Sequence, residues 1–366
     1  MAEQVAQTAD QRRDALVARL FEAVLGVNDL CMIYVGDRLG FYRALADIDS
    51  ATSAELAAAT STHERYVREW LEQQAVTGIL EVDDPDLEAG ARRYRIPDGH
   101  EEVLTERDSL NYLAPFARMM AGIVRPLPAV IEAFRSGGGV PYAEYDADFC
   151  EGQAEMNRVQ FVNLLGSEWL PAVPDVHARL REDPPARVAD VACGTGWSSI
   201  ALASAYPKIR IDGFDLDEYS IELANKNLAG TGLEDRVKFE VRDAADSTLF
   251  GGYDLVTVFE AIHDMARPVE VLRTIRGLLA DGGTIIVADE RVAEKFAAPG
   301  DDVERLMYGW SVLHCLPVGM AEQPSAATGT AMRPETLRRY AAEAGFRDVE
   351  ILPIENDFWR FYRLTS

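Results

Sequence analysis

The sequence predicts an α/β protein in which a mainly helical N-terminal domain precedes a doubly wound, largely parallel sheet of seven strands. From residue 187 onward, short apolar runs alternate with helical patterns, which is typical of a parallel sheet with helices on both faces. The last two runs are joined by little more than Glu355, Asn356 and Asp357, too few residues for a helical crossover. The last strand should therefore be antiparallel.

The strands of this sheet are placed on the apolar runs, and the helices between them. Helices are expected up to Ala205, from Glu218, from Pro268 and over residues 334–344. The seven expected strands are residues 187–193, 209–215, 237–242, 253–259, 284–287, 349–354 and 359–364.

The first hundred residues have the element order of a winged helix. Apolar residues recur at helical spacing over residues 11–46, and Gly40 divides them into two helices. Two capping-box patterns then open further helices, and a small hairpin follows. The boxes are Thr52 to Glu55 and Ser61 to Glu64, and the hairpin strands lie in 78–82 and 92–96.

The remaining stretch, residues 101–185, is expected to be helical with interruptions at prolines and at the glycines after Ser136, and it has no catalytic signature. We therefore place the domain limits at 1–100, 101–185 and 186–366, with residues 301–330 as a long insertion in the last domain.

Composition argues against a nucleic-acid or membrane partner. Sixty-one acidic and 36 basic side chains give a net charge of −25, which repels phosphate backbones and anionic lipids. Residues 1–100 alone carry ten basic and eighteen acidic side chains, so the winged helix is not expected to bind DNA.

The four cysteines are far apart and show no CxxC spacing, which predicts neither a zinc site nor a disulfide framework. No carboxylate-rich cluster or His-x-x-x-His pair indicates another metal. The N-terminus is polar and no apolar run approaches 18 residues. We therefore expect a cytoplasmic protein without a membrane span.

A glycine-rich turn between the first expected strand and helix carries the main chemical signal. Asp190, Ala192, Gly194 and Gly196 form an acidic-x-small-x-Gly-x-Gly run, in which glycines let the backbone bend tightly and approach a ligand. A dinucleotide fingerprint would require a third glycine where Ser199 stands. The turn therefore predicts a nucleotide cofactor other than a nicotinamide dinucleotide.

Acidic residues at the ends of the next two strands fit the same cofactor. Asp215 lies about 20 residues past the turn, where a carboxylate accepts hydrogen bonds from a ribose. Asp217 is the better candidate for the helix N-cap. Asp243 ends the third strand and can accept from an adenine amino group, although Asp246 is close. Leu216, Ala244 and Phe259 are the further expected cofactor contacts.

This turn resembles motif I of class I S-adenosylmethionine (SAM) methyltransferases, with Ala192 at the position of the usual first glycine. The antiparallel end of the Rossmann-like sheet is a second point of resemblance. The whole chain is similar to bacterial small-molecule O-methyltransferases whose winged helix dimerises. The resemblance implies SAM as cofactor, a homodimer, and a helical linker over residues 101–185 that roofs the acceptor site.

His263 follows the fourth strand and matches the His-Asp step of these enzymes. The resemblance implies that its imidazole takes the proton from an acceptor hydroxyl, and a pKa near 6.5 suits that role. Two carboxylates are candidates for orienting the ring, Glu290 at the end of the fifth strand and Asp264 beside the histidine, and the sequence leaves both open.

The insertion 301–330 is expected to cover a flat, apolar acceptor, or alternatively to pack only on itself. His314 within it is a second candidate base. Aromatic and methionine side chains in the linker are more typical of a core than of a pocket. The candidate acceptor contacts are Tyr308, Trp310, His314, Met156 and Phe161.

The sequence thus predicts a SAM-dependent methyltransferase that modifies a hydroxyl of a small aromatic or polyketide-like molecule. One alternative is an enzyme of the same fold that methylates nitrogen or carbon, or that uses SAM without methylating. A second alternative is a ligand-responsive winged-helix regulator that binds DNA, against which the charge counts.

Overall fold

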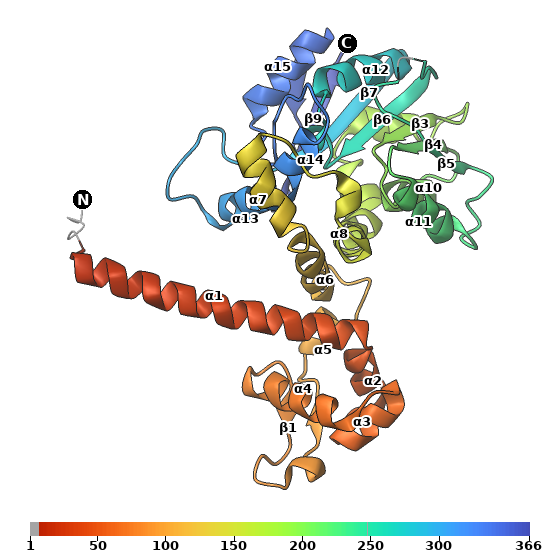
Figure 1. The fold of residues 1–366 in the computed structure, drawn as a ribbon. Coiled ribbons are helices and arrows are strands. Elements are labelled where there is room, and N and C mark those ends of the chain that lie inside the picture. Colours follow the sequence, from red (N-terminus) through yellow and green to blue (C-terminus); the bar gives the residue numbers. More distant parts are fainter. Residues whose placement is uncertain (1–6, 247) are drawn as a thin grey trace, which may run out of the picture. The chain divides into compact units, whose positions relative to one another are not determined.

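The computed structural model describes residues 7–246 and 248–366, and these form two compact units (Figure 1). The first unit ends at Ala121 and the second begins at Gly122. This division lies inside the stretch that the sequence predicts as a linker.

The first unit has the predicted winged-helix elements, packed on a core that includes Leu45, Leu56 and Trp70. A break at Gly40 separates the first two helices, as predicted. The strands β1 and β2 pair antiparallel. The elements are α1 (Ala9–Arg38), α2 (Phe41–Ile48), α3 (Ser53–Thr60), α4 (Glu64–Val76), β1 (Glu81–Val82), η1 (Ala89–Ala91), β2 (Tyr94–Arg95) and α5 (His100–Leu104).

One of the two predicted capping boxes is confirmed. Thr52 and Glu55 cap α3 reciprocally. The second is wrong, because Ser61 adopts a left-handed conformation at φ 55° and ends α3 instead of opening α4. The N-cap of α4 is His63, whose side chain accepts from the backbone N–H of Arg65.

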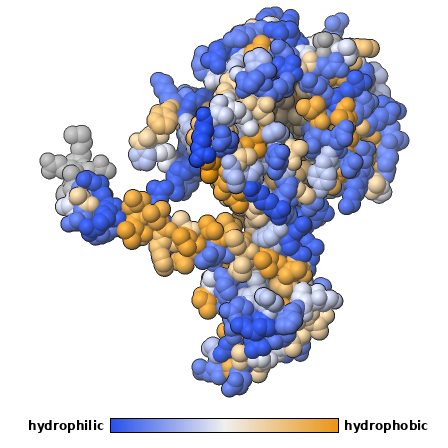
Figure 2. Space-filling view, in the orientation of Figure 1, coloured by the Kyte–Doolittle hydropathy of each residue, from blue (hydrophilic) through white to orange (hydrophobic). Residues whose placement is uncertain are grey.

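The middle of α1 exposes an apolar stripe, visible as orange along this helix in Figure 2. Each of its members is more than 40 % exposed, whereas Met32 and Ile33 near the end of α1 pack against the core of the first unit. The stripe comprises Leu16, Val17, Leu20, Phe21, Val24, Leu25 and Val27.

The second unit begins within a helical stretch, and its helix α8 continues directly into a π-helix. The Ser136 break is present, because Gly137 adopts a left-handed conformation and ends α7. No helix among the described residues is both long and apolar enough to span a bilayer. The division falls within α6 (Ala114–Ile123). The helices that follow are α7 (Leu127–Ser136), η2 (Tyr142–Glu144), α8 (Ala147–Gln160), η3 (Phe161–Trp169) and α9 (Pro174–Arg179).

The predicted seven-stranded sheet is confirmed, with the order β5-β4-β3-β6-β7-β9-β8. The last strand, β9, is antiparallel to both of its neighbours, and the other pairs are parallel. The strands are β3 (Arg187–Val191), β4 (Arg210–Asp215), β5 (Val237–Val241), β6 (Tyr253–Phe259), β7 (Leu279–Glu290), β8 (Asp348–Ile351) and β9 (Trp359–Thr365).

Alternation along the strands builds one core on each face of the sheet. Val188 packs with the cluster that contains α10 (Trp197–Ala205) and α11 (Glu218–Leu228), and the next residue, Ala189, packs on the opposite face. That face is covered by α12 (Pro268–Leu278) and α15 (Pro334–Ala344), as Figure 1 shows. Strands β3 to β7 are mutually parallel, so their carboxyl ends share one edge, where ligands of such sheets bind.

Candidate active site

Asp190, in β3 just before the glycine-rich turn, anchors the turn through hydrogen bonds. It is 1 % exposed, and its carboxylate accepts hydrogen bonds from the hydroxyls of Ser198 at 2.5 Å, Ser199 at 2.7 Å and Thr257 at 2.8 Å. These donors tie β3 to the first turn of α10 and to β6. These contacts let Asp190 position the turn, and its direct contact with the cofactor stays a prediction.

The turn itself contains three residues with positive φ: Ala192 at 57°, Gly194 at 51° and Gly196 at 80°. An added Cβ at Gly196 would lie 2.5 Å from the Phe239 ring, so glycine is required there by packing. An added Cβ at Gly194 would meet nothing within 4 Å. The space beside Gly194 is therefore free for a ligand to approach the backbone.

Asp215 stands at the end of β4, facing this turn. One carboxylate oxygen accepts from the Gly194 backbone N–H at 2.8 Å and the other from the Asp217 N–H at 2.9 Å. Each oxygen keeps a further lone pair for a ribose hydroxyl. Burial raises the pKa of Asp215. The neighbouring Leu216 is 67 % exposed, and Asp217 caps α11 as predicted.

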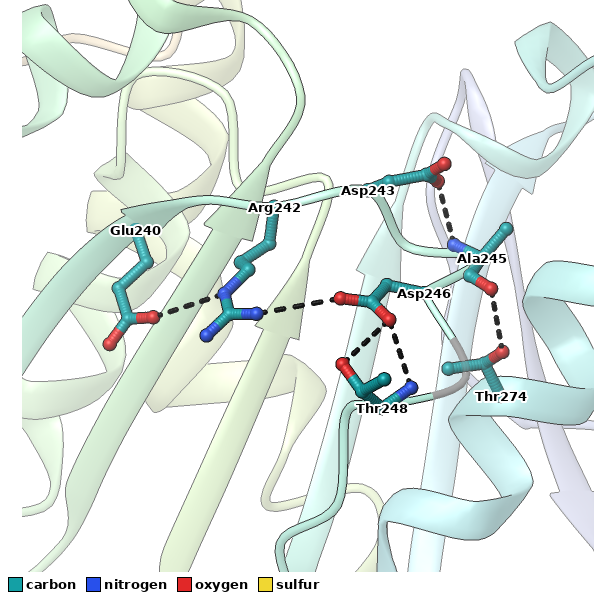
Figure 3. Close-up of polar contacts among 7 residues, drawn as sticks. All are labelled: Glu240, Arg242, Asp243, Ala245, Asp246, Thr248 and Thr274. Carbon is teal, nitrogen blue, oxygen red and sulfur yellow. Dashed lines mark hydrogen bonds and ion pairs between the residues drawn. The ribbon is translucent and has the colours of Figure 1, made fainter.

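The loop after β5 distinguishes the two candidate adenine contacts (Figure 3). Asp246 is engaged locally, because it accepts from the backbone and hydroxyl of Thr248 and lies 3.4 Å from Arg242. Asp243 accepts from the Ala245 backbone N–H at 2.8 Å and lies 3.5 Å from Arg267. Asp243 and the half-buried Ala244 thus remain the better placed pair.

His263 lies on the short helix η4 (Ile262–Asp264) just past β6, and it is 3 % exposed. Its Nδ1 is 2.8 Å from Asp289 Oδ1, and its Nε2 is 3.1 Å from Asp264 Oδ1. Burial alone would lower the pKa of His263, but Asp289 and then Asp264 hold it well above its ordinary value. Two carboxylates thus fix the ring and make it a strong base.

The residue that holds Nδ1 is Asp289 and not Glu290, which corrects one of the two candidates. Side chains alternate along β7, so Asp289 continues the face of Ile285 and Val287, on which His263 lies. Glu290 continues the opposite face. The contact from Asp264, the other candidate, is present at Nε2.

A second carboxyl group at this edge has no signal in the sequence analysis. Glu260 directly follows β6 and has a positive φ of 51°. It accepts hydrogen bonds from Asn157 Nδ2 and, at 2.5 Å, from Trp359 Nε1. Trp359 pairs with Glu290 in the β7–β9 ladder. Glu260 and Glu290 therefore lie together at the carboxyl ends of β6 and β7.

His314 is enclosed by aromatic rings. Its ring centroid lies 4.2 Å from Phe149, 4.5 Å from Tyr145 and 5.7 Å from Tyr142. Burial lowers its pKa to about 4, so the ring is neutral near pH 7 and a weak base. Its Nε2 has no hydrogen-bond partner in the described part of the chain. This geometry suits a hydrogen bond to an acceptor better than the role of second base.

The insertion contains α13 (Asp302–Trp310), the π-helix η5 (Ser311–Cys315) and α14 (Leu316–Met320). It contacts the His263 element, because an added Cβ at Gly319 would lie 3.0 Å from the Asp264 carbonyl oxygen. It also contacts the segment before α8: Val140 donates to the Pro317 carbonyl at 2.9 Å. At Gly139 an added Cβ would meet the backbone of Ala321, Pro317 and Met320.

The other expected acceptor contacts lie in different surroundings. Phe161 is buried among Phe259 and Trp359, with ring centroids 5.4 and 5.5 Å away, which favours a core role for Phe161 and Phe259. Tyr308 is 38 % exposed, and its hydroxyl accepts from Arg333 at 3.2 Å. Trp310 and Met156 are half-buried.

Cys315 is a further residue that the sequence analysis left out of the site. Its thiol lies 3.5 Å from His314 Nδ1. Among the described residues, one group of His263, Asp264 and Cys315 has potential ligand atoms within 4.8 Å of one another. His263 Nε2 already contacts Asp264 in that group, and this contact explains the closeness without an ion.

Comparison with known families decides what this arrangement belongs to. Residues 182–340 match the family model described as a methyltransferase domain, and residues 29–106 match an Rv2258c-like winged HTH domain. The chain thus carries a SAM-dependent methyltransferase domain. Its winged helix precedes the methyltransferase domain, as the sequence predicted.

Relatives match only parts of this methyltransferase. It is 29 % identical over 121 residues to the 27-O-demethylrifamycin SV methyltransferase of Amycolatopsis mediterranei, covering 33 % of this chain and 44 % of the relative. It is 31 % identical over 114 residues to the ajmaline N-methyltransferase of Rauvolfia serpentina, covering 30 % and 39 %. The matched part thus spans less than half the length of these relatives.

Solved structures match over nearly the whole fold. A putative O-methyltransferase from Nostoc punctiforme superposes with a TM-score of 0.70 at 19 % identity, covering 95 % of this chain and 98 % of that one. The mitomycin 7-O-methyltransferase MmcR gives 0.65 at 20 %, covering 97 % and 99 %. Human N-acetylserotonin methyltransferase in complex with SAM gives 0.64 at 19 %, covering 100 % and 99 %. These likenesses concern the fold.

The residues of the turn fit SAM. The free space beside Gly194 admits a ligand against the backbone, and Asp215 offers two carboxylate oxygens whose contacts are backbone N–H groups. A ribose diol donates hydrogen bonds, and a carboxylate is its natural acceptor.

Proposed function

We propose that this methyltransferase methylates a hydroxyl group of a small aromatic or polyketide-like molecule, with His263 as general base. The observation that carries the proposal is the imidazole fixed between Asp289 and Asp264, at the same sheet edge as the motif I turn and Asp215. Bound SAM supplies an electrophilic methyl group on its sulfonium.

The chain's own residues have three tasks in this reaction. Gly194 and Asp215 hold the donor's nucleoside part, with Asp243, Ala244 and Leu216 as further contacts. Holding the acceptor oxygen in line with the methyl group supplies most of the rate enhancement. His263 removes the hydroxyl proton, which contributes roughly 10²- to 10⁴-fold more.

Asp289 and Asp264 set the pH at which His263 works. Because they hold the pKa of His263 well above its ordinary value, the ring is mostly protonated at low pH and cannot accept a proton. The base form becomes populated as pH rises through that raised pKa. Turnover should therefore rise with pH.

The surroundings of His314 support a flat acceptor. Phe149, Tyr145 and Tyr142 offer ring faces and edges around it, and its unpaired Nε2 offers one hydrogen bond. Relatives whose names specify O-methylation, such as the rifamycin methyltransferase, support a hydroxyl as the target.

Methylation of nitrogen is the second candidate, and one observation favours it. His263 contacts a carboxylate at each ring nitrogen, and a protonated ring is a poor base. An amine with a free lone pair needs no base, so His263 would then only position the acceptor. Among the relatives, the ajmaline enzyme is named for N-methylation.

We further propose a homodimer built through the stripe on α1. Seven apolar side chains on one helix, each more than 40 % exposed, form a surface that monomeric proteins rarely leave in water. A second copy of the same stripe is the proposed partner. Helix α4 does not favour DNA as the partner, because Arg65 and Arg68 pair with Glu69 and Glu64 on the same helix.

The test is transfer of labelled methyl from SAM to a panel of hydroxylated aromatic and polyketide compounds. His263→Ala should leave the affinity for S-adenosylhomocysteine nearly unchanged and lower turnover by about 10²-fold or more. The exposed His100 provides a matched control, and His100→Ala should behave as wild type. Near-full turnover by His263→Ala would refute the role of His263 as general base and would favour methylation of nitrogen.

A further inference from the structure

The edge of the sheet around His263 holds more carboxyl groups than the proposed proton transfer uses. Asp264 and Asp289 contact the imidazole, but Glu260 and Glu290 do not. Four carboxyl groups thus lie at the carboxyl ends of β6 and β7, and two of them contact the imidazole. The two glutamates have no basic side chain as a hydrogen-bond or ion-pair partner in the described part of the chain.

Glu290 has an oxygen without a partner. Its side chain is 3 % exposed, and within residues 7–246 and 248–366 no donor reaches its Oε2. The Oδ2 of the adjacent Asp289 is in the same state. An unpaired buried acceptor costs about 1–3 kcal/mol, and more when it is charged. Asp289 faces the other side of β7, so the unpaired oxygen of Glu290 stands by itself and indicates a donor that arrives from outside the chain.

Glu260 lies at the end of the neighbouring strand β6, and both of its carboxylate oxygens accept hydrogen bonds. Its backbone is left-handed, a conformation that costs a non-glycine residue about 1–3 kcal/mol and tends to persist at functional sites. Asn157 and Trp359 fix its two oxygens, and its backbone N–H donates to the Ala288 carbonyl at 2.8 Å. Unlike Glu290, Glu260 is only half-buried.

We propose that Glu260 and Glu290 recognise a positively charged amine on the acceptor, so that the substrate carries both the group to be methylated and a basic nitrogen. An ammonium group offers charged N–H donors, one of which can satisfy the unpaired Oε2 of Glu290. This inference rests on the proposed methyl transfer and specifies the class of its acceptor.

The position in the sheet assigns the pair to the acceptor and not to the donor. The motif I turn and Asp215 follow β3 and β4, whereas Glu260 and Glu290 follow β6 and β7 on the other side of β3. His263, which would act on the acceptor, follows β6 as well.

Without a cation, the pair retains a proton. Burial, and then the neighbouring Glu260, raises the pKa of Glu290 well above its ordinary value, and burial raises the pKa of Glu260 to about 7. His263, Asp289 and Asp264 are the other charged groups that act on Glu290. An arriving ammonium should displace this proton, so binding of an amine near pH 7 releases up to one proton.

The experiment compares phenolic amines with neutral isosteres on the full-length protein loaded with S-adenosylhomocysteine. Tyramine against 4-propylphenol and dopamine against 4-propylcatechol are suitable pairs, measured by calorimetry at pH 7 in two buffers of different ionisation enthalpy. The amine should bind about tenfold or more tightly than its isostere, with proton release for the amine only.

Glu290→Gln should reduce this preference to about onefold. If Glu290→Gln fails to fold, Glu260→Gln replaces it and should reduce the preference equally. Glu350→Gln, on the exposed side of β8, removes the same charge and should keep the preference. Absence of an amine preference in wild type, or its persistence in both variants, overturns the inference while leaving methyl transfer intact.

The donor provides a further decisive comparison, because SAM is a sulfonium and S-adenosylhomocysteine is a neutral thioether. If Glu290→Gln weakens SAM but not S-adenosylhomocysteine, the carboxyl group serves the donor and the inference is overturned. If the wild type binds neither of these two ligands, the proposed function itself fails.

Discussion

Replacing Asp215 tests the cofactor site without any knowledge of the acceptor. Asp215→Asn retains one acceptor oxygen toward the Gly194 or Asp217 N–H and removes the negative charge. The change is nearly isosteric, but the asparagine NH2 group cannot accept, so one of the two backbone contacts is lost and the other is kept. The expected effect is weaker binding of SAM and of S-adenosylhomocysteine.

The magnitude follows from the hydrogen bonds at this carboxylate. A hydrogen bond to a charged group contributes roughly 1.5–3 kcal/mol, and the asparagine retains one neutral acceptor where a ribose diol would donate twice. A loss of about 1.5–3 kcal/mol corresponds to roughly 10- to 150-fold in Kd. Asp215→Ala should lose at least as much, and it should also lower the melting temperature because the two backbone N–H groups lose their acceptor.

Calorimetric titration with S-adenosylhomocysteine measures the effect, and Asp217→Ser serves as the control. Serine preserves the N-cap of α11 while removing a charge two residues away from Asp215. A Kd of Asp215→Asn within about twofold of wild type would refute the ribose role. Equal weakening by Asp217→Ser would show that general electrostatics, and not a specific contact, is responsible.

Three further predictions concern stability, titration and assembly. Gly196→Ala should lower the free energy of unfolding by about 2–4 kcal/mol, because the new Cβ would clash with the Phe239 ring at a residue with a left-handed φ. Ala192→Gly should not lower the free energy of unfolding, and urea titration measures both variants. NMR titration of His263 should give a pKa above 6.5. In Asp289→Asn this pKa should fall, because the carboxylate that offsets the effect of burial is lost; an unchanged pKa would contradict the role of Asp289. Leu20→Glu should convert a dimer into a monomer in sedimentation at micromolar concentration, and a wild-type monomer would exclude the proposed interface.

Features that depend on local sequence were predictable. The glycine break after α1, the Thr52 capping box and the Asp217 N-cap each rest on a few adjacent residues, and all three are confirmed. The antiparallel last strand followed from a connection too short for a helix. The Ser61 box failed because the same pattern lies at the end of one helix and the start of the next.

Features that depend on pleat and packing were not predictable in the same way. Choosing Asp289 over Glu290 requires the face that each presents in β7, and a shift of one residue reverses that face. Glu260 is held by hydrogen bonds from Asn157 and Trp359, which lie about 100 residues away on either side in the sequence. The signal that could have identified Asp289 is the alternation of side chains along β7, which places Asp289 on the same face as Ile285 and Val287.

The backbone contact at Gly139 has a consequence for the timing of the reaction cycle. Val140 and Pro317 are far apart in the chain but share a hydrogen bond, and no side chain separates Gly139 from the insertion. Any movement that lets a product leave past α14 must therefore carry the segment before α8 with it. If product leaves by this route, we expect its release to need a coordinated displacement of two stretches and therefore to be slower than the swing of a free loop. Its rate should respond to changes near Gly139 as strongly as to changes in the insertion.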